Sequence, residues 1–141
     1  MLPERAIRAR CAMNDPALIL IVEDNAGSLM LATVALEIEG FAVAGAESAE
    51  QARTVLATQT PDLILMDIQL PGIDGLDFTK ELKADPQTSS IPVIALTAHA
   101  MPLHERAARA AGCAGFIAKP WTPAALSREV RAFLTNVQET S

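Results

Sequence analysis

Five polar residues in this sequence each stand at the end of a short apolar run, and their types suit metal-assisted chemistry on a phosphate. They are Glu23, Asp24, Asp67, Thr97 and Lys119. If these ends meet, three carboxylates share one pocket and repel one another, and either a cation or raised pKa values must relieve that repulsion. Lys119 supplies one positive charge and a divalent ion supplies two, so together they balance the three acids. Mg²⁺ suits such a pocket because it prefers oxygen ligands and commonly bridges to phosphate oxygens.

The reaction that such a pocket supports is transfer of a phosphoryl group to a carboxylate. Asp67 would attack the phosphorus of a donor and form an aspartyl phosphate. Mg²⁺ and Lys119 would stabilise charge on the transferring group, and Thr97 would donate its hydroxyl to a phosphoryl oxygen. No cluster of histidines or thiolates in the sequence favours zinc.

The apolar runs predict the strands that would bring these residues together. They cover residues 18–22, 41–44, 62–66, 92–96 and 115–118, and segments of helical length separate them. The first, third and fourth runs are continuously apolar, which is typical of strands buried on both faces of a parallel sheet. Five strand–helix units with right-handed crossovers predict a doubly wound α/β fold with a five-stranded parallel sheet. In such sheets the site lies outside the carboxyl ends of the strands, where the five polar residues would converge.

Capping residues and one apolar stripe mark the expected helices. The helix at residues 47–59 has Ser48 as a cap near its start. Its apolar stripe consists of Ala49, Ala52, Val55 and Leu56. Gly40 and Gly112 can end the first and fourth helices, because glycine tolerates the left-handed conformation found there. The first helix is apolar all round, so the pattern does not assign its buried face.

Composition favours a globular protein that contacts neither nucleic acid nor membrane. Half of the 141 residues are hydrophobic, and the length is typical of one domain with its own core. The net charge of −6 argues against a nucleic-acid surface, which needs clustered Lys and Arg. No apolar run approaches the roughly 18 residues that cross a bilayer, and no secretory signal is evident. Two isolated cysteines agree with a reducing, cytoplasmic location, and we expect Cys113 to be a small buried thiol.

We divide the chain into an N-terminal extension at residues 1–16 and one domain at residues 17–137, with no output domain. The extension carries Arg5, Arg8 and Arg10 and closes at Asp15-Pro16. Two interpretations of it stay open. One is a flexible tail, including the case in which Met13 is the true start, and the other is a docking segment.

Four motifs, in order, resemble those of the receiver domains of two-component response regulators. They are residues 19–25 (ILIVEDN), 61–72 (PDLILMDIQLPG), 95–98 (ALTA) and 115–120 (GFIAKP). The likeness covers about residues 17–137 and is closest to stand-alone receivers and to the receivers of hybrid histidine kinases. It implies a flavodoxin-like (βα)5 fold with strand order 2-1-3-4-5.

The resemblance also implies a role for each acidic residue. Asp67 would be the phosphoacceptor, assisted by Thr97 and Lys119 as described above. Asp24, Asp67 and the backbone carbonyl of Gln69 would be the protein ligands of Mg²⁺. Glu23 would complete the acidic pair, a position that in the family often acts on the metal through water.

Two further pairs of residues would control the signal. Thr97 and Phe116 match the switch pair of the family, in which the hydroxyl moves toward the phosphate and the aromatic ring turns inward. Gln69 and His99 stand two residues past Asp67 and Thr97, where side chains flank the phosphoryl group and tune its hydrolysis. An exposed loop histidine without a role is the alternative for His99.

Other acids near these motifs have simpler interpretations. Asp62 begins the third apolar run at the opposite edge of the sheet, and we expect it to be a surface residue. Asp74 and Asp77 stand where a helix begins, and acids are favourable near that end of the helix dipole.

Together these residues indicate a signalling receiver that is switched by phosphorylation. A histidine kinase or histidine phosphotransfer protein would donate the phosphoryl group. A downstream protein would bind the face formed by the fourth helix, the fifth strand and the fifth helix. The alternative is a constitutive receiver-like binding module that does not switch. We expect no enzyme activity beyond self-phosphorylation and slow dephosphorylation, because Gln69 stands where an aspartyl phosphatase commonly carries its general acid.

Overall fold

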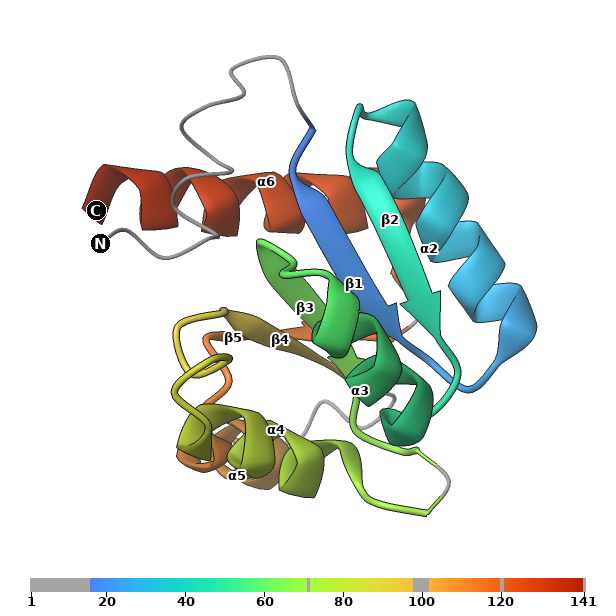
Figure 1. The fold of residues 1–141 in the computed structure, drawn as a ribbon. Coiled ribbons are helices and arrows are strands. Elements are labelled where there is room, and N and C mark those ends of the chain that lie inside the picture. Colours follow the sequence, from blue (N-terminus) through green and yellow to red (C-terminus); the bar gives the residue numbers. More distant parts are fainter. Residues whose placement is uncertain (1–15, 71, 98–101, 120, 141) are drawn as a thin grey trace.

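The chain forms a five-stranded parallel sheet with helices on both faces (Figure 1). A computed structural model describes residues 16–70, 72–97, 102–119 and 121–140, with the backbone alone for residues 102–104 and 135–140. The strands are β1 (Leu18–Val22), β2 (Ala42–Ala46), β3 (Leu63–Asp67), β4 (Val93–Thr97) and β5 (Gly115–Ala118). The helices are α2 (Ala26–Ile38), α3 (Ala49–Thr58), α4 (Gly75–Ala84), α5 (Pro102–Ala111) and α6 (Pro123–Thr140). The strand order β2-β1-β3-β4-β5 confirms the predicted fold.

The strands begin and end close to the predicted residues, with one difference that matters for the site. β3 and β4 each extend one residue further than the apolar runs, to Asp67 and Thr97. The hydrogen-bond ladder continues because the Ile68 amide donates to the Leu96 carbonyl (3.1 Å) and the Lys119 amide donates to the Thr97 carbonyl (2.6 Å). Asp67 and Thr97 are therefore held within the sheet rather than in the loops that follow it.

The two faces of the sheet carry separate apolar clusters. α3, α4 and α5 cover one face, where Ala52, Phe78 and Leu82 pack against the strands. α2 and α6 cover the other face and contribute Leu36 and Val130 (Figure 1). β1, β3 and β4 are buried along their whole length, which explains their continuously apolar sequences. In the part of the chain that the structure describes, no helix is both long and apolar enough to span a membrane.

The predicted caps occupy their expected places. The Ser48 side chain accepts a hydrogen bond from the Gln51 amide (3.2 Å) at the start of α3. Asp74 caps α4 in the same way by accepting from the Leu76 amide (2.7 Å). Gly40 has a φ angle of +96°, which is the left-handed conformation expected for a residue that ends a helix.

The structure assigns the buried face of α2, which the sequence pattern left open. Ala32, Ala35 and Leu36 are buried against the sheet and α6. The hydroxyl of Ser127 on α6 donates to the carbonyl oxygen of Ala35 (3.3 Å), which joins the two helices. The opposite face of α2 is apolar as well and is exposed.

The surface interpretation of Asp62 is wrong. Asp62 does lie at the edge of the sheet opposite the predicted site, but its side chain is buried. Its carboxylate accepts a hydrogen bond from the Leu18 amide (2.8 Å), and its own amide donates to the Leu18 carbonyl (2.7 Å). Asp62 therefore satisfies the first backbone donor of β1 and joins β1 to the start of β3.

The prediction that Cys113 is a small buried thiol is confirmed. Cys113 packs in the cluster under α3, α4 and α5. Burial raises the pKa of its thiol, although a hydrogen bond with Thr79 and the charge of Lys83 act in the opposite direction. A raised pKa leaves less of the reactive thiolate at neutral pH.

Removing the Asp62 carboxylate should lower the stability of the fold. We expect Asp62→Ala to reduce the free energy of unfolding by about 1–3 kcal/mol, because the buried Leu18 amide loses its acceptor. Urea denaturation followed by circular dichroism measures this change. Glu129→Ala, which removes an exposed acid from the middle of α6, is the control and should shift the free energy by less than about 0.5 kcal/mol. Equal effects of the two substitutions would show that the buried hydrogen bond adds nothing.

The Cys113 thiol should resist modification in the folded protein. In a Cys11→Ser background, we expect Cys113 to react with a chromogenic disulfide reagent at pH 8 much more slowly before unfolding than after it. The control carries Cys113→Ala and Ala114→Cys, which moves the thiol to an exposed neighbour, and should react at once. Similar rates for the two thiols in the folded state would contradict the burial of Cys113.

Candidate functional site

The carboxyl ends of four strands bring the sequence-predicted residues to one edge of the sheet. Glu23 and Asp24 follow β1, and Asp67 and Thr97 are the last residues of β3 and β4. Lys119 follows β5. Its backbone amide donates a hydrogen bond to the Thr97 carbonyl, which fixes the position of its Cα and so the start of its side chain. Because neighbouring strands are parallel and in register, all these residues leave the sheet in the same direction.

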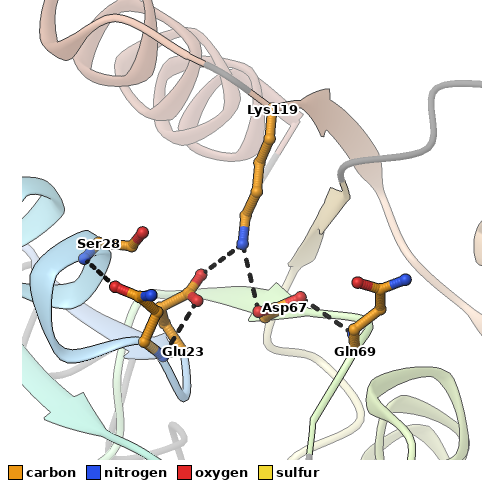
Figure 2. A network of polar contacts seen from close by, with 6 residues as sticks. Glu23, Ser28, Asp67, Gln69 and Lys119 are labelled. Carbon is orange, nitrogen blue, oxygen red and sulfur yellow. Dashed lines mark hydrogen bonds and ion pairs between the residues drawn. The ribbon is translucent and has the colours of Figure 1, made fainter.

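The centre of the site is an ion-paired triad of Lys119, Glu23 and Asp67 (Figure 2). The Lys119 ammonium Nζ lies 2.8 Å from Glu23 Oε2 and 3.2 Å from Asp67 Oδ2. The two carboxylate side chains are nearly inaccessible, at 3% and 5% exposure, and Lys119 is 23% exposed. The lysine therefore reaches from the surface into a buried acidic pocket.

The second oxygen of each carboxylate is held by the backbone. Asp67 Oδ1 accepts a hydrogen bond from the Gln69 amide (2.9 Å), as Figure 2 shows. Glu23 Oε1 accepts a longer one from the Asn25 amide (3.3 Å). In each acid, one carboxylate oxygen accepts a hydrogen bond from Lys119 and the other accepts one from the backbone amide two residues further along the chain. These bonds orient both carboxylates.

Burial and charge shift the ionisation of the triad. Burial raises the pKa of Glu23; the hydrogen bond from Lys119 lowers it and the neighbouring Asp67 raises it further. Burial by itself lowers the pKa of Lys119, but its hydrogen bond to Glu23 and the charge of Asp67 outweigh that effect and raise it. The lysine is therefore held in its charged form by the acids that surround it.

A third acid completes a cluster that fits a hard divalent cation. Glu23, Asp24 and Asp67 each offer a carboxylate oxygen, and these oxygens all lie within 4.8 Å of one another. Asp24 is exposed, so the cluster is open to solvent on its side. Three carboxylates face a single ammonium, which leaves an excess of negative charge. An all-oxygen donor set with excess negative charge matches what Mg²⁺ requires.

The remaining predicted residues differ in how far they are buried. Thr97 is buried at the end of β4. Phe116 is partly buried and packs against the cluster under α3, α4 and α5. Gln69 is exposed, two residues after Asp67. His99 lies outside the residues that the structure describes.

Sequence reasoning missed two residues that position the site. Asn25 caps α2, since its side chain accepts from the Ser28 amide (2.9 Å), and its backbone amide holds Glu23. An Asn before a helical segment is a recognised capping signal that could have revealed this role. A Cβ at Gly75 would overlap the Asp67 carbonyl oxygen and lie 2.7 Å from Ile68 Cα. No spacing rule signals that close approach, because it depends on how α4 meets β3.

Comparison with known proteins gives one consistent result. The family model of the response regulator receiver domain matches residues 19–131. The polar-differentiation response regulator DivK of Brucella anthropi is 38% identical over 119 residues, which cover 84% of this chain and 97% of the relative.

Solved receiver domains of histidine kinases have the same fold. One from Syntrophus aciditrophicus is 31% identical, with a TM-score of 0.79 over 89% of this chain and 95% of that chain. The receiver domain of the sensor histidine kinase PA1611 from Pseudomonas aeruginosa is 32% identical, with a TM-score of 0.78 over 85% and 98% of the two chains. That structure has a magnesium ion coordinated in its active-site cleft.

Neutralising Asp24 should affect stability and metal binding in opposite directions. We expect Asp24→Asn to raise the free energy of unfolding in metal-free buffer by up to about 1 kcal/mol, because it relieves repulsion among the three acids. The same change should weaken the stabilisation that Mg²⁺ gives the wild-type protein, since it removes one negative charge from the acidic cluster. Thermal denaturation with EDTA and across a Mg²⁺ titration measures both effects.

Asp77→Asn is the control for Asp24→Asn, because Asp77 is an exposed acid on α4 outside the cluster. It should leave the response to Mg²⁺ unchanged. If Asp24→Asn and the wild-type protein gained equally from Mg²⁺, the acidic cluster would not be the metal site.

Proposed function

The chain belongs to the response regulator receiver domain family, and from this family membership we propose that it accepts a phosphoryl group on Asp67 and signals in the phosphorylated state. Receiver domains act in two-component signalling, where they interact with histidine kinases and downstream proteins. The observation that carries the proposal is the place of Asp67, whose buried carboxylate is paired with Lys119 and lies in one cluster with the other two acids.

The transfer needs a carboxylate nucleophile and positive charge close to it. A carboxylate oxygen of Asp67 forms a bond to phosphorus while the bond between phosphorus and the donor's histidine nitrogen breaks, and the imidazole leaves with a proton. Lys119 already lies 3.2 Å from Asp67, so it can follow the charge onto the phosphoryl oxygens. The Gln69 amide keeps the carboxylate oriented during the approach of the donor.

Asp24, Asp67 and the backbone carbonyl of Gln69 would hold Mg²⁺ at the acidic cluster. Glu23 would complete the acidic cluster and add its negative charge beside the metal. When bound, Mg²⁺ neutralises phosphoryl oxygens and orients the transferring group. The oxygen-only donor set and the excess of negative charge support this assignment.

Thr97 and Phe116 would pass the change at Asp67 on to the surface. Thr97 ends β4, the strand next to Asp67, so a small displacement brings its hydroxyl toward a phosphoryl oxygen. Phe116 is the register partner of Ala95 on that same strand, so its ring lies one strand away from the strand that ends at Thr97. The face formed by α5, β5 and α6 carries this ring, which supports it as the surface that a downstream protein binds.

Gln69 and His99 would tune how long the phosphoryl group persists. Gln69 is exposed two residues past Asp67, where its side chain can meet the water that attacks the phosphoryl group. The tuning role of His99 stays a prediction that rests on its place two residues past Thr97.

The assembled site argues against the alternative of a constitutive binding module. Such a module has no need of an ion-paired phosphoacceptor beside an open acidic cluster, and this chain has both. We also infer that the protein acts on its own Asp67 rather than as an enzyme on a separate substrate. Its chemistry is then self-phosphorylation and slow dephosphorylation.

Replacing Asp67 should abolish phosphorylation. We expect the wild-type protein to gain one phosphoryl group from acetyl phosphate when Mg²⁺ is present and none with EDTA, because the charge at the site must be neutralised. Asp67→Asn should gain none under either condition, whereas Asp77→Asn should behave as the wild type. Intact-protein mass spectrometry after a rapid quench measures the adduct. No adduct on the wild-type protein at short quench times would favour the constitutive module.

A further inference from the structure

α2 presents an apolar face to solvent on the side opposite the sheet. Met30, Leu31, Val34 and Ile38 are 68%, 49%, 46% and 76% exposed, and they are the large hydrophobic residues with high exposure in the described part of the chain. At 3.6 residues per turn, these four positions fall within one stripe about 100° wide. A contiguous apolar stripe of this kind marks an interaction surface, whereas single exposed hydrophobic residues do not.

The end of this stripe is acidic. Glu37 is exposed beside the stripe in the last turn of α2, and that turn contains no basic residue. Glu39 follows at the cap and pairs with Arg131 (3.0 Å). The carboxyl end of the helix dipole adds further negative charge at this point. An occupant that combines apolar and basic side chains would therefore match the surface.

The N-terminal segment enters the fold at the acidic end of the stripe. The Ala17 carbonyl accepts a hydrogen bond from the Ala42 amide (2.9 Å), directly after the turn that ends α2. In that turn the Phe41 amide donates to the Leu36 carbonyl of α2 (3.0 Å). The point at which residues 1–15 join the domain therefore lies near the carboxyl end of α2, where the exposed stripe ends.

The segment has the length and the composition that the stripe requires. Fifteen residues can extend about 50 Å, whereas the 13 residues of α2 span about 20 Å. Its three arginines outnumber its two acids, so the segment has a formal charge of +1. The remaining residues have a formal charge of −7, which gives the chain its net charge of −6. It also brings apolar side chains at Leu2, Ile7 and Met13.

We propose that residues 1–15 fold back along α2 and dock on the stripe of Met30, Leu31, Val34 and Ile38. The apolar residues of the segment cover the stripe, and its arginines lie near Glu37 and Glu39. The occupant of this surface is therefore the chain itself. This proposal does not depend on phosphorylation of Asp67.

A spin label on Cys11 tests the docking in the full-length chain. The background is Cys113→Ala, which removes the buried thiol, and amide signals are followed by ¹⁵N NMR. We expect the label to broaden the amides of residues 30–38 strongly. The amides of α3, on the opposite face of the sheet, should stay sharp and serve as the internal reference.

Two pairs of substitutions test whether the broadening depends on the apolar stripe of α2. Val34→Asp with Ile38→Asp should remove the broadening, because it places two charges on the stripe. Thr54→Asp with Thr58→Asp introduces two aspartates at the same spacing on exposed positions of α3 and should leave the broadening intact. The proposal is overturned if both pairs give the same spectrum, or if the label broadens α2 and α3 equally.

A mixed sample shows whether the segment docks on its own chain or on a second copy of the protein. Spin-labelled chains at natural isotope abundance are combined with ¹⁵N chains in which Cys11→Ser prevents labelling. Sharp amides at residues 30–38 in this mixture are expected for docking within one chain. Broadening there would assign the surface to a dimer and overturn the proposal.

Discussion

The contact of Lys119 with both Glu23 and Asp67 is the interaction on which the site depends. Two buried carboxylates this close repel each other, and the ammonium group of Lys119 offsets that repulsion by contacting both. The sheet supplies that geometry, because β1 and β3 are neighbours and β4 places β5 one strand further away. A lysine side chain is long enough to cover this distance, so one flexible cation joins three separate strands. The parallel sheet is therefore part of the site and not merely its support.

The apolar runs and the polar residues that follow them allowed most of the fold and the central residues of the site to be predicted. Strands buried on both faces leave a strong signal, since nearly every residue in them must be apolar. Asp67 and Thr97 could be recognised because each interrupts such a run at its end. The one-residue shift in β3 and β4 arose because backbone hydrogen bonds continue where the apolar sequence stops.

Other features depend on contacts that no local pattern records. Asp62 looked like a surface acid, yet it satisfies the first amide of β1, whose position is set by strand pairing. Gly75 is required by the approach of α4 to β3, and its neighbours in sequence do not reveal that approach. The helix α2 has apolar residues on every side, so only the packed structure distinguishes its buried face from its exposed one. In each case tertiary packing decided what periodicity could not.

The long separation between Lys119 and its partners has a consequence for how the protein matures. Lys119 is 96 residues from Glu23 and 52 residues from Asp67 along the chain. During synthesis the two acids leave the ribosome well before the lysine that neutralises them. A nascent chain that has placed β1 and β3 still lacks the cation, so the acids face each other without compensation. The cation beside Asp67, on which the proposed phosphoryl transfer depends, therefore reaches the site only when the last strand joins the sheet.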